Sequence, residues 1–179
     1  MSLHNVTPGD GAPDEFNVII EIPMNADPIK YEVDESTGAL FVDRFMATAM
    51  HYPCNYGYIP QTKADDGDPV DVLVITPVAL LPSVVVRCRP IGMLQMEDEA
   101  GGDNKLLAVP ISRVLPLYSQ WQEPENLNPM RLHAIQHFFE HYKDLEPGKW
   151  VKVKGWKSSA DAKLEVTRGI ADWKKAHGR

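Results

Sequence analysis

The sequence Asp65-Asp66-Gly67-Asp68-Pro69-Val70-Asp71-Val72-Leu73-Val74-Ile75 places four carboxylates within seven residues, and an apolar run follows them. Gly-Asp and Asp-Pro pairs favour turns, and a short run of valine, leucine and isoleucine favours a buried strand. We therefore expect a tight acidic loop that leads into a rigid strand. Like charges this close repel one another, and carboxylate oxygens suit a hard divalent cation such as Mg²⁺ or Ca²⁺.

The spacing of this acidic loop excludes an EF-hand calcium site. A loop that starts at Asp66 puts Asp71 where the glycine must stand and Pro77 where the bidentate glutamate must stand. A loop that starts one residue earlier fails at the same two positions. Two interpretations remain, a solvated acidic surface loop or a site that holds Mg²⁺ and leaves room for water and phosphate.

The composition indicates one acidic globular domain. The 179 residues are enough for a single core, and the hydrophobic fraction of 44% excludes disorder. The net charge of −7 argues against general nucleic-acid binding, which requires a basic surface. We expect a single domain over residues 1–179, in which residues 1–15 form an N-terminal extended segment.

Three features favour a cytoplasmic protein without a membrane anchor. Cys54 and Cys88 have no metal or redox spacing and are too few for a disulfide framework. The polar N-terminus has no apolar segment of the kind that a signal peptide needs. The longest apolar region, residues 70–86, is interrupted by Asp71 and two prolines, so we expect no membrane span.

Alternating and apolar stretches predict short strands with glycine and proline turns between them. In the first strand, Val18, Ile20 and Ile22 should share the buried face, while Glu21 should lie on the solvated face. Three tyrosines among glycine and proline predict an irregular, well-packed segment at residues 50–60. The predicted strands are residues 16–22, 29–34, 40–45, 70–76, 83–96, 105–111 and 149–156.

Two helices are expected late in the chain. Residues 128–145 repeat apolar side chains at helical spacing, and Ser158 with Asp161 forms a capping box for a terminal helix. Many short strands and few helices predict a mainly β (α+β) fold built on a closed barrel.

Charged residues on the predicted strands can converge on one site. Lys30, Glu32 and Arg44 would meet if the hairpin of residues 29–45 curls into the barrel wall. A second acidic turn, residues 97–105, ends at Lys105, and two acidic turns at strand ends can supply one metal cluster from both sides. The alternative for each is a solvated sheet residue or an ordinary polar hairpin.

A competing motif lies on the first predicted helix. His137-Phe138-Phe139-Glu140-His141 matches H-x-x-E-H, the motif of a group of zinc proteases. Histidines four residues apart share a helix face and can bind zinc, with Glu146 or Glu165 as candidate third ligand. A zinc metalloprotease is therefore an alternative, although a motif with two free positions often occurs by chance.

The chain also resembles a known family. Five stretches occur in order and together are similar to the soluble family I inorganic pyrophosphatases of bacterial type: Glu21-Ile22-Pro23, Ile29-Lys30-Tyr31-Glu32, Asp43-Arg44, Tyr52-Pro53-Cys54-Asn55-Tyr56-Gly57-Tyr58 and Asp66-Gly67-Asp68-Pro69-Val70-Asp71-Val72. The resemblance extends from about Val18 to Trp156. It implies a distorted five-stranded OB-like closed barrel with two outer helices late in the chain. It also implies Mg²⁺-dependent hydrolysis of inorganic pyrophosphate to two phosphates, with several Mg²⁺ ions per active site.

The resemblance assigns roles to individual residues. Asp66, Asp71 and Asp103 match acids that hold activating metals, and Asp71 would bridge two of them. Asp98 matches an acid that contacts substrate-borne metals, and Asp68 matches the general base beside the attacking water. The groups around the phosphates match Lys30, Arg44, Tyr56, Tyr142, Lys143 and Lys105. Supporting positions match Glu21, Glu32 and Tyr52.

Direct attack by metal-activated water is the expected mechanism, because no serine, cysteine or histidine nucleophile is needed. The resemblance further implies a hexamer of two trimers, in which His137, His141 and Asp144 match positions at the contact between trimers. Ser119 to Met130 and His51 fit the family pattern poorly. A non-enzymatic OB-type binding module is a further alternative, but the acidic charge and the absence of a basic aromatic strip argue against nucleic acid as a partner.

Overall fold

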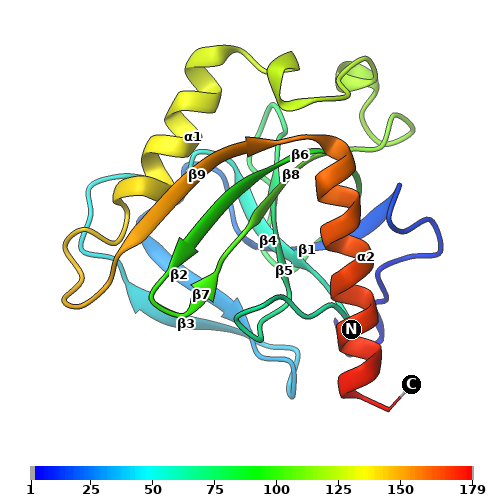
Figure 1. Ribbon diagram of the computed structural model, residues 1–179, viewed down its shortest axis with the longest axis horizontal. Coiled ribbons are helices and arrows are strands. Elements are labelled where there is room, and N and C mark those ends of the chain that lie inside the picture. Colours follow the sequence, from blue (N-terminus) through cyan, green and yellow to red (C-terminus); the bar gives the residue numbers. More distant parts are fainter. Residues whose placement is uncertain (1–2, 179) are drawn as a thin grey trace.

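The computed structural model describes residues 3–178 of the chain. Figure 1 shows a curled β structure with two helices packed on its outside. In chain order the elements are η1 (Leu3–Asn5), β1 (Phe16–Ile22), β2 (Ile29–Val33), β3 (Leu40–Phe45), β4 (Asn55–Ile59), β5 (Val70–Val74), β6 (Val85–Asp98), β7 (Gly101–Gly102), β8 (Lys105–Pro110), η2 (Pro116–Tyr118), η3 (Pro124–Asn126), α1 (Pro129–His141), β9 (Val151–Lys157) and α2 (Ser159–Ala176).

Five strands close into a ring. The order is β1-β4-β5-β8-β6, and β6 pairs back to β1. The β5–β8 pairing is parallel, and the other four pairings of the ring are antiparallel. Ring closure satisfies the hydrogen-bonding edges that an open sheet would expose. The predicted mainly β fold with a five-stranded OB-like closed barrel is thereby confirmed.

The remaining elements extend this barrel. The long strand β6 also pairs with β7 and β9, while β2 and β3 form a separate two-stranded hairpin. Helix α1 packs beside β9, and α2 packs against β6 and β5, so both late helices lie outside the ring (Figure 1). Among residues 3–178, no helix is both long and apolar enough to cross a membrane.

The apolar core has two parts because neighbouring strand residues point to opposite faces of the sheet. On β5, Leu73 belongs to the cluster that contains Phe139 of α1. Its neighbour Val72 belongs to the other cluster, which contains Val166 of α2. Each late helix therefore covers one apolar face.

A register shift in β1 changes its predicted faces. The pairing with β4 is irregular between Ile20 and Ile22, so Val18 and Ile20 join the cluster under α2 while Ile22 joins the cluster under α1. The predicted common face of the three residues is therefore wrong at Ile22. Glu21 is also not solvated, because its side chain is buried with 6% exposure.

Strand β4 lies where the sequence predicted an irregular segment, so that prediction is wrong for residues 55–59. All five residues of β4 are buried between β1 and β5. Gly57 explains why the segment looks unlike a strand. A Cβ at this position would lie 2.0 Å from the carbonyl oxygen of Ile19, so the close approach of β1 requires glycine.

The helix boundaries follow their capping residues. Asn128 caps α1 by accepting a hydrogen bond from the backbone of Met130, and the helix ends at His141, earlier than predicted. Tyr142 therefore follows the helix in a turn. The capping box of Ser158 and Asp161 is confirmed at the start of α2.

Candidate active site

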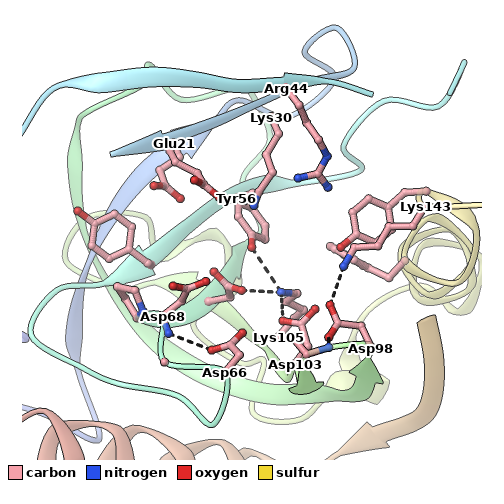
Figure 2. A pocket seen from close by; sticks show the side chains of 18 of the residues that line it. Glu21, Lys30, Arg44, Tyr56, Asp66, Asp68, Asp98, Asp103, Lys105 and Lys143 are labelled. Carbon is pink, nitrogen blue, oxygen red and sulfur yellow. Dashed lines mark hydrogen bonds and ion pairs between the residues drawn. The ribbon is translucent and has the colours of Figure 1, made fainter. Parts of the chain in front are cut away.

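A cavity of about 500 Å³ lies between the barrel, the β2–β3 hairpin and the end of α1. Figure 2 shows acidic side chains on one side of it and basic side chains of the hairpin facing them. All of the site residues predicted from the sequence line this cavity: Glu21, Lys30, Glu32, Arg44, Tyr52, Tyr56, Asp66, Asp68, Asp71, Asp98, Asp103, Lys105, Tyr142 and Lys143.

The acidic turn before β5 supplies two of these carboxylates, Asp66 and Asp68, and β5 itself supplies a third. Asp66 accepts a hydrogen bond over 3.1 Å from the backbone amide of Asp68, which tightens the turn around Gly67. Gly67 has a φ of 98°, a left-handed conformation that glycine adopts without strain. Asp71 follows on β5 and lines the cavity, while its neighbour Val72 is fully buried in the core. The alternation of the strand thus separates the acid from the apolar residue.

Lys105 connects two acids at the floor of the cavity. The parallel pairing of β5 with β8 places Lys105 opposite Asp71. Its Nζ donates over 2.5 Å to Asp71 Oδ2 and also to Asp103 Oδ1, and it lies 3.4 Å from the hydroxyl of Tyr56. Burial alone lowers the pKa of Lys105, but the two carboxylates outweigh it and hold the pKa well above its usual value. Lys105 is therefore a permanent buried cation.

Lys143 brings the end of α1 to the second acidic turn. Its Nζ donates over 2.6 Å to Asp98 Oδ2, and both residues are buried. The other oxygen of Asp98 accepts a hydrogen bond over 2.8 Å from the backbone amide of Ala100. Because each Asp98 oxygen has a donor, the carboxylate is held in one orientation.

The β2–β3 hairpin provides the basic wall of the cavity. Lys30 and Arg44 face each other across the hairpin. Lys30 forms an ion pair with Glu32, and Arg44 donates from Nε to Glu146 over 3.1 Å. Lys30, Glu32 and Arg44 line the same cavity, but the hairpin that carries them is a separate two-stranded sheet and does not form part of the barrel wall as predicted.

Four tyrosines line the cavity, Tyr58 and the three predicted site residues, and they are neutral donors. Tyr52, Tyr56 and Tyr142 are all buried, and the rings of Tyr52 and Tyr56 lie 5.3 Å apart. Burial raises the pKa of each phenol above its usual value. The hydroxyls therefore remain protonated and can donate hydrogen bonds to an anion.

Several carboxyl groups are held in an unfavourable environment for their charge. Burial raises the pKa of Glu21 to about 8, although the backbone amide of Val33 donates to it over 2.7 Å. Burial, with repulsion from neighbouring acids, raises the pKa of Asp66 to about 6. Burial also raises the pKa of Asp71, against the opposing effect of Lys105. Burial is the largest cause of each shift, so these carboxylates are costly to ionise unless a further cation lies beside them.

Acidic groups also outnumber basic groups in the cavity. Nine carboxyl groups and five cationic side chains line it, an excess of four acidic groups. An all-oxygen donor set with excess negative charge suits a hard cation such as Mg²⁺, so the residues fit a magnesium site. The acids are Glu21, Glu32, Glu35, Asp66, Asp68, Asp71, Asp98, Glu99 and Asp103, and the cations are Lys30, Arg44, Lys105, Lys143 and Lys149.

Some residues that line the cavity, notably Glu99 and Lys149, are not among the site residues predicted from the sequence. These two form an ion pair with Lys149 Nζ 2.6 Å from Glu99 Oε1. Glu99 adjoins Asp98 in the second acidic turn, and that adjacency could have identified it. No local sequence pattern marks Lys149 as a site residue, because it is the antiparallel pairing of β9 with the end of β6 that brings it near the cavity.

The H-x-x-E-H motif lies away from this cavity. His137 and His141 are exposed on α1, whereas Phe139 and Tyr142 of the same region line the cavity. A zinc protease would need its motif in a cleft that receives a peptide, and none of the three motif residues lines this one.

Comparison with known proteins agrees with the geometry. Residues 18–174 match the family model described as Inorganic pyrophosphatase. The chain belongs to the inorganic pyrophosphatase family. The inorganic pyrophosphatase of Escherichia coli (strain K12) is 56% identical over 179 residues and the match covers 100% of both chains. That of Xylella fastidiosa (strain 9a5c) is 53% identical over 174 residues, which cover 97% of this chain and 98% of the relative.

Solved structures of the family share the fold. The structure of an inorganic pyrophosphatase from Coxiella burnetii superposes with a TM-score of 0.91 at 53% sequence identity, covering 94% of this chain and 100% of that one. Membership of the inorganic pyrophosphatase family confirms the resemblance seen in the sequence. It also argues against the zinc protease and the non-enzymatic binding module.

Proposed function

We propose that this chain hydrolyses inorganic pyrophosphate to two phosphates with the help of several Mg²⁺ ions. The observation that carries the proposal is the arrangement of a single cavity, in which a cluster of aspartates faces the lysine and arginine of the hairpin (Figure 2). Such a cavity can hold cations and a polyanion side by side. The names of the relatives point to the same substrate.

Asp66, Asp71 and Asp103 are the proposed ligands of the activating Mg²⁺ ions, and Asp98 the proposed ligand of ions that arrive with the substrate. All four line the cavity, and each comes from a different place: Asp66 from the turn before β5, Asp71 from β5, Asp98 from the end of β6, and Asp103 from the segment between β7 and β8. When bound, Mg²⁺ ions neutralise substrate charge and lower the pKa of a coordinated water.

Asp68 is the proposed general base. Its side chain is exposed at the cavity, in the turn that also contains Asp66. An accessible carboxylate beside the metal ligands can accept a proton from water as the water attacks phosphorus. Direct attack by water needs no covalent intermediate on the protein.

The basic wall is proposed to bind the two phosphates. Lys30, Arg44 and Lys143 supply positive charge, and Tyr56 and Tyr142 supply neutral hydroxyl donors. These groups stabilise the charge that develops on the leaving phosphate. Lys105 is held between two aspartates, so we assign it to orienting Asp71 and Asp103 in addition to contacting phosphate.

We further propose a cytoplasmic homohexamer built of two trimers. Exposed apolar side chains on the surface, among them Phe45, Met130 and Leu145, support association with other copies. The free thiols of Cys54 and Cys88 support a reducing compartment. The molar mass in solution, measured by light scattering, tests the assembly, and a monomer at all concentrations would contradict it.

Substrate selectivity tests the proposed activity. The protein is stripped with a chelator, supplied with excess Mg²⁺, and given pyrophosphate or a phosphate monoester in parallel. We expect phosphate release from pyrophosphate to exceed release from the monoester by at least about 100-fold, because the cavity has donors for two phosphates. Equal rates on both substrates would contradict the proposal.

A further inference from the structure

A buried threonine joins the two ends of the β4–β5 loop, residues 60–69, which contains the acidic turn. Thr62 is 2% exposed and does not line the cavity. Its hydroxyl donates over 2.6 Å to the carbonyl oxygen of Ile59, the last residue of β4. The same hydroxyl accepts over 2.9 Å from the backbone amide of Val70, the first residue of β5. One side chain therefore ties the strand that enters the loop to the strand that leaves it.

Helix α2 holds the same loop from outside the barrel. The backbone amide of Lys63 donates over 2.9 Å to the carbonyl oxygen of Gly169. Gly169 is buried, and a Cβ at this position would lie 2.6 Å from Val70 Cγ2 and 3.3 Å from Thr62 Cβ. Because glycine has no side chain, α2 can approach the loop closely enough for the hydrogen bond to Lys63 to form.

The contacts at the base of the loop are connected to the acids of the cavity. The backbone amide of Ala64 donates over 2.7 Å to the carbonyl oxygen of Asp68, which closes the turn that contains Asp66. Asp71 directly follows the residue whose amide binds the Thr62 hydroxyl. All three acids line the cavity, so their positions depend on how firmly the base of the loop is held.

We propose that Thr62 and Gly169 are positioning residues, which hold the β4–β5 loop in the conformation that binds Mg²⁺. The proposal rests on the proposed function, in which Asp66 and Asp71 are Mg²⁺ ligands and Asp68 is the base. Carboxylates this close repel one another, so a loop without these contacts would let them move apart. A loop that is already ordered avoids the entropic cost of ordering when the metal binds.

Mg²⁺ titration by calorimetry on chelator-stripped, folded protein tests this role. Thr62→Val keeps the shape of the side chain but leaves the buried amide of Val70 without its acceptor. We expect the tightest Mg²⁺ binding to weaken by at least about 10-fold, as when an outer partner of a metal ligand is lost. Thr62→Ser keeps the hydroxyl and should restore the affinity to within about 3-fold of the wild type.

Thr76→Val is the matched control for loss of stability. Thr76 is also buried, and its hydroxyl donates over 2.6 Å to the carbonyl oxygen of Val78 and accepts over 2.6 Å from Asn55. It follows β5 at the end away from the acidic turn. Thr76→Val should lower the urea midpoint as Thr62→Val does, yet leave Mg²⁺ affinity unchanged.

Gly169→Ala tests the contact from the side of the helix. Alanine is the better helix former, so a purely helical effect would stabilise α2. The added methyl group would press on Val70 and Thr62, so we expect Mg²⁺ affinity to fall by about 10-fold nonetheless. Thr167→Ala, at an exposed position of the same helix, should leave the affinity unchanged.

Steady-state kinetics at saturating Mg²⁺ give a second readout. The proposed phosphate donors lie outside the β4–β5 loop, so Thr62→Val should change KM for pyrophosphate by less than about 3-fold. Its kcat should fall by at least about 10-fold, because Asp68 is displaced from the attacking water. A wild type that does not hydrolyse pyrophosphate would contradict the proposed function, whereas the Mg²⁺ affinities would still decide the roles of Thr62 and Gly169.

Equal Mg²⁺ affinities in the wild type, Thr62→Val and Gly169→Ala would overturn the proposal. A loss in Thr76→Val as large as that in Thr62→Val would also overturn it, because general destabilisation would then explain both. If Thr62→Val does not fold, Gly169→Ala decides: a lowered affinity supports the proposal, and the wild-type affinity overturns it.

Discussion

Asp71 on β5 and Lys105 on β8 lie opposite each other in the parallel pair of strands of the barrel, joined by a hydrogen bond of 2.5 Å. The same ammonium bonds Asp103, so one lysine compensates two acids that the fold has placed side by side. The pairing of two particular strands thereby creates the acidic floor of the cavity. A charge in so buried a position has consequences that stability measurements can detect.

Replacing the buried lysine should destabilise the protein without metal. Lys105→Met leaves Asp71 and Asp103 without their cation, so the free energy of unfolding should fall by about 3 kcal/mol. Added Mg²⁺ should restore part of this loss, because it compensates the same carboxylates. Urea unfolding with and without Mg²⁺ measures both effects.

Lys152→Met is the matched control for this comparison. Lys152 is an exposed residue of β9, with 69% of its side chain accessible, so its loss should change stability by no more than about 0.5 kcal/mol. Equal unfolding midpoints for Lys105→Met and Lys152→Met would show that the ion pairs on Lys105 do not hold the acidic floor together.

Substitutions of Asp68 and Asp71 should distinguish loss of the chemical step from loss of metal binding. Asp68→Asn removes the proposed base and should lower kcat by at least about 100-fold while Mg²⁺ affinity is largely kept. Asp71→Asn should lower Mg²⁺ affinity as well, because Asp71 is a proposed metal ligand. Steady-state kinetics and Mg²⁺ calorimetry on both variants measure the difference. A near wild-type rate for Asp68→Asn across the pH range would rule out the base assignment.

Glu21 should make the metal-free protein less stable as pH rises. Its pKa is raised from 4.5 to about 8 by burial, so the folded state holds this proton more tightly than the unfolded state. The stabilisation of the folded state by protonated Glu21 is therefore fully present below about pH 4.5. It falls as the pH rises towards 8, and it is lost above about pH 8. Glu21→Gln should remove the decline, a difference on the order of 3 kcal/mol at high pH. Unfolding of both proteins in chelator across this range tests the effect, and parallel stability profiles would contradict it.

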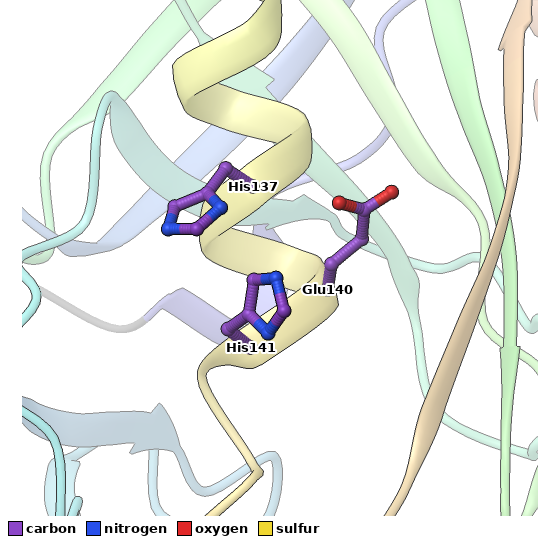
Figure 3. A group of neighbouring side chains, drawn as sticks. All are labelled: His137, Glu140 and His141. Atoms are coloured by element: carbon purple, nitrogen blue, oxygen red, sulfur yellow. The ribbon is translucent and has the colours of Figure 1, made fainter.

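Assembly should depend on the outer face of α1 if that face forms a contact between trimers. His137 and His141 are exposed beside each other (Figure 3), and negative charge placed on both would repel a second copy of the same face. We therefore expect His137→Glu/His141→Glu to lower the molar mass in solution, which light scattering measures. A molar mass equal to that of the wild type would count against the contact.

Local sequence signals were sufficient for part of the fold. The β2–β3 hairpin, the Ser158 capping box and the acidic turn before β5 depend on neighbouring residues, and the structure has all of them. The site residues could be predicted because family motifs record where distant segments meet. Residue types alone left the charged residues with a solvated alternative and the tyrosines of residues 50–60 with a packing alternative.

Other features depend on contacts that no local pattern encodes. Ile22 changes face because β1 has an irregular register with β4. In the sequence, Gly57 looks like a turn residue. The structure shows that glycine is needed there because the carbonyl oxygen of Ile19 packs against it. Glu21 is buried, and Lys149 reaches Glu99, because strands far apart in sequence pair with one another. Such features depend on contacts between distant segments and cannot be inferred from one segment at a time.

The central claim is that the acidic cavity hydrolyses pyrophosphate with Mg²⁺. The most direct test is phosphate release from pyrophosphate by chelator-stripped protein, measured as Mg²⁺ is added back to the wild type and to Asp71→Asn. The account predicts no release without Mg²⁺, a rise with Mg²⁺ in the wild type, and a shift of that rise to higher Mg²⁺ with a lower maximum in Asp71→Asn. Release that is independent of Mg²⁺, or unchanged in Asp71→Asn, would contradict it.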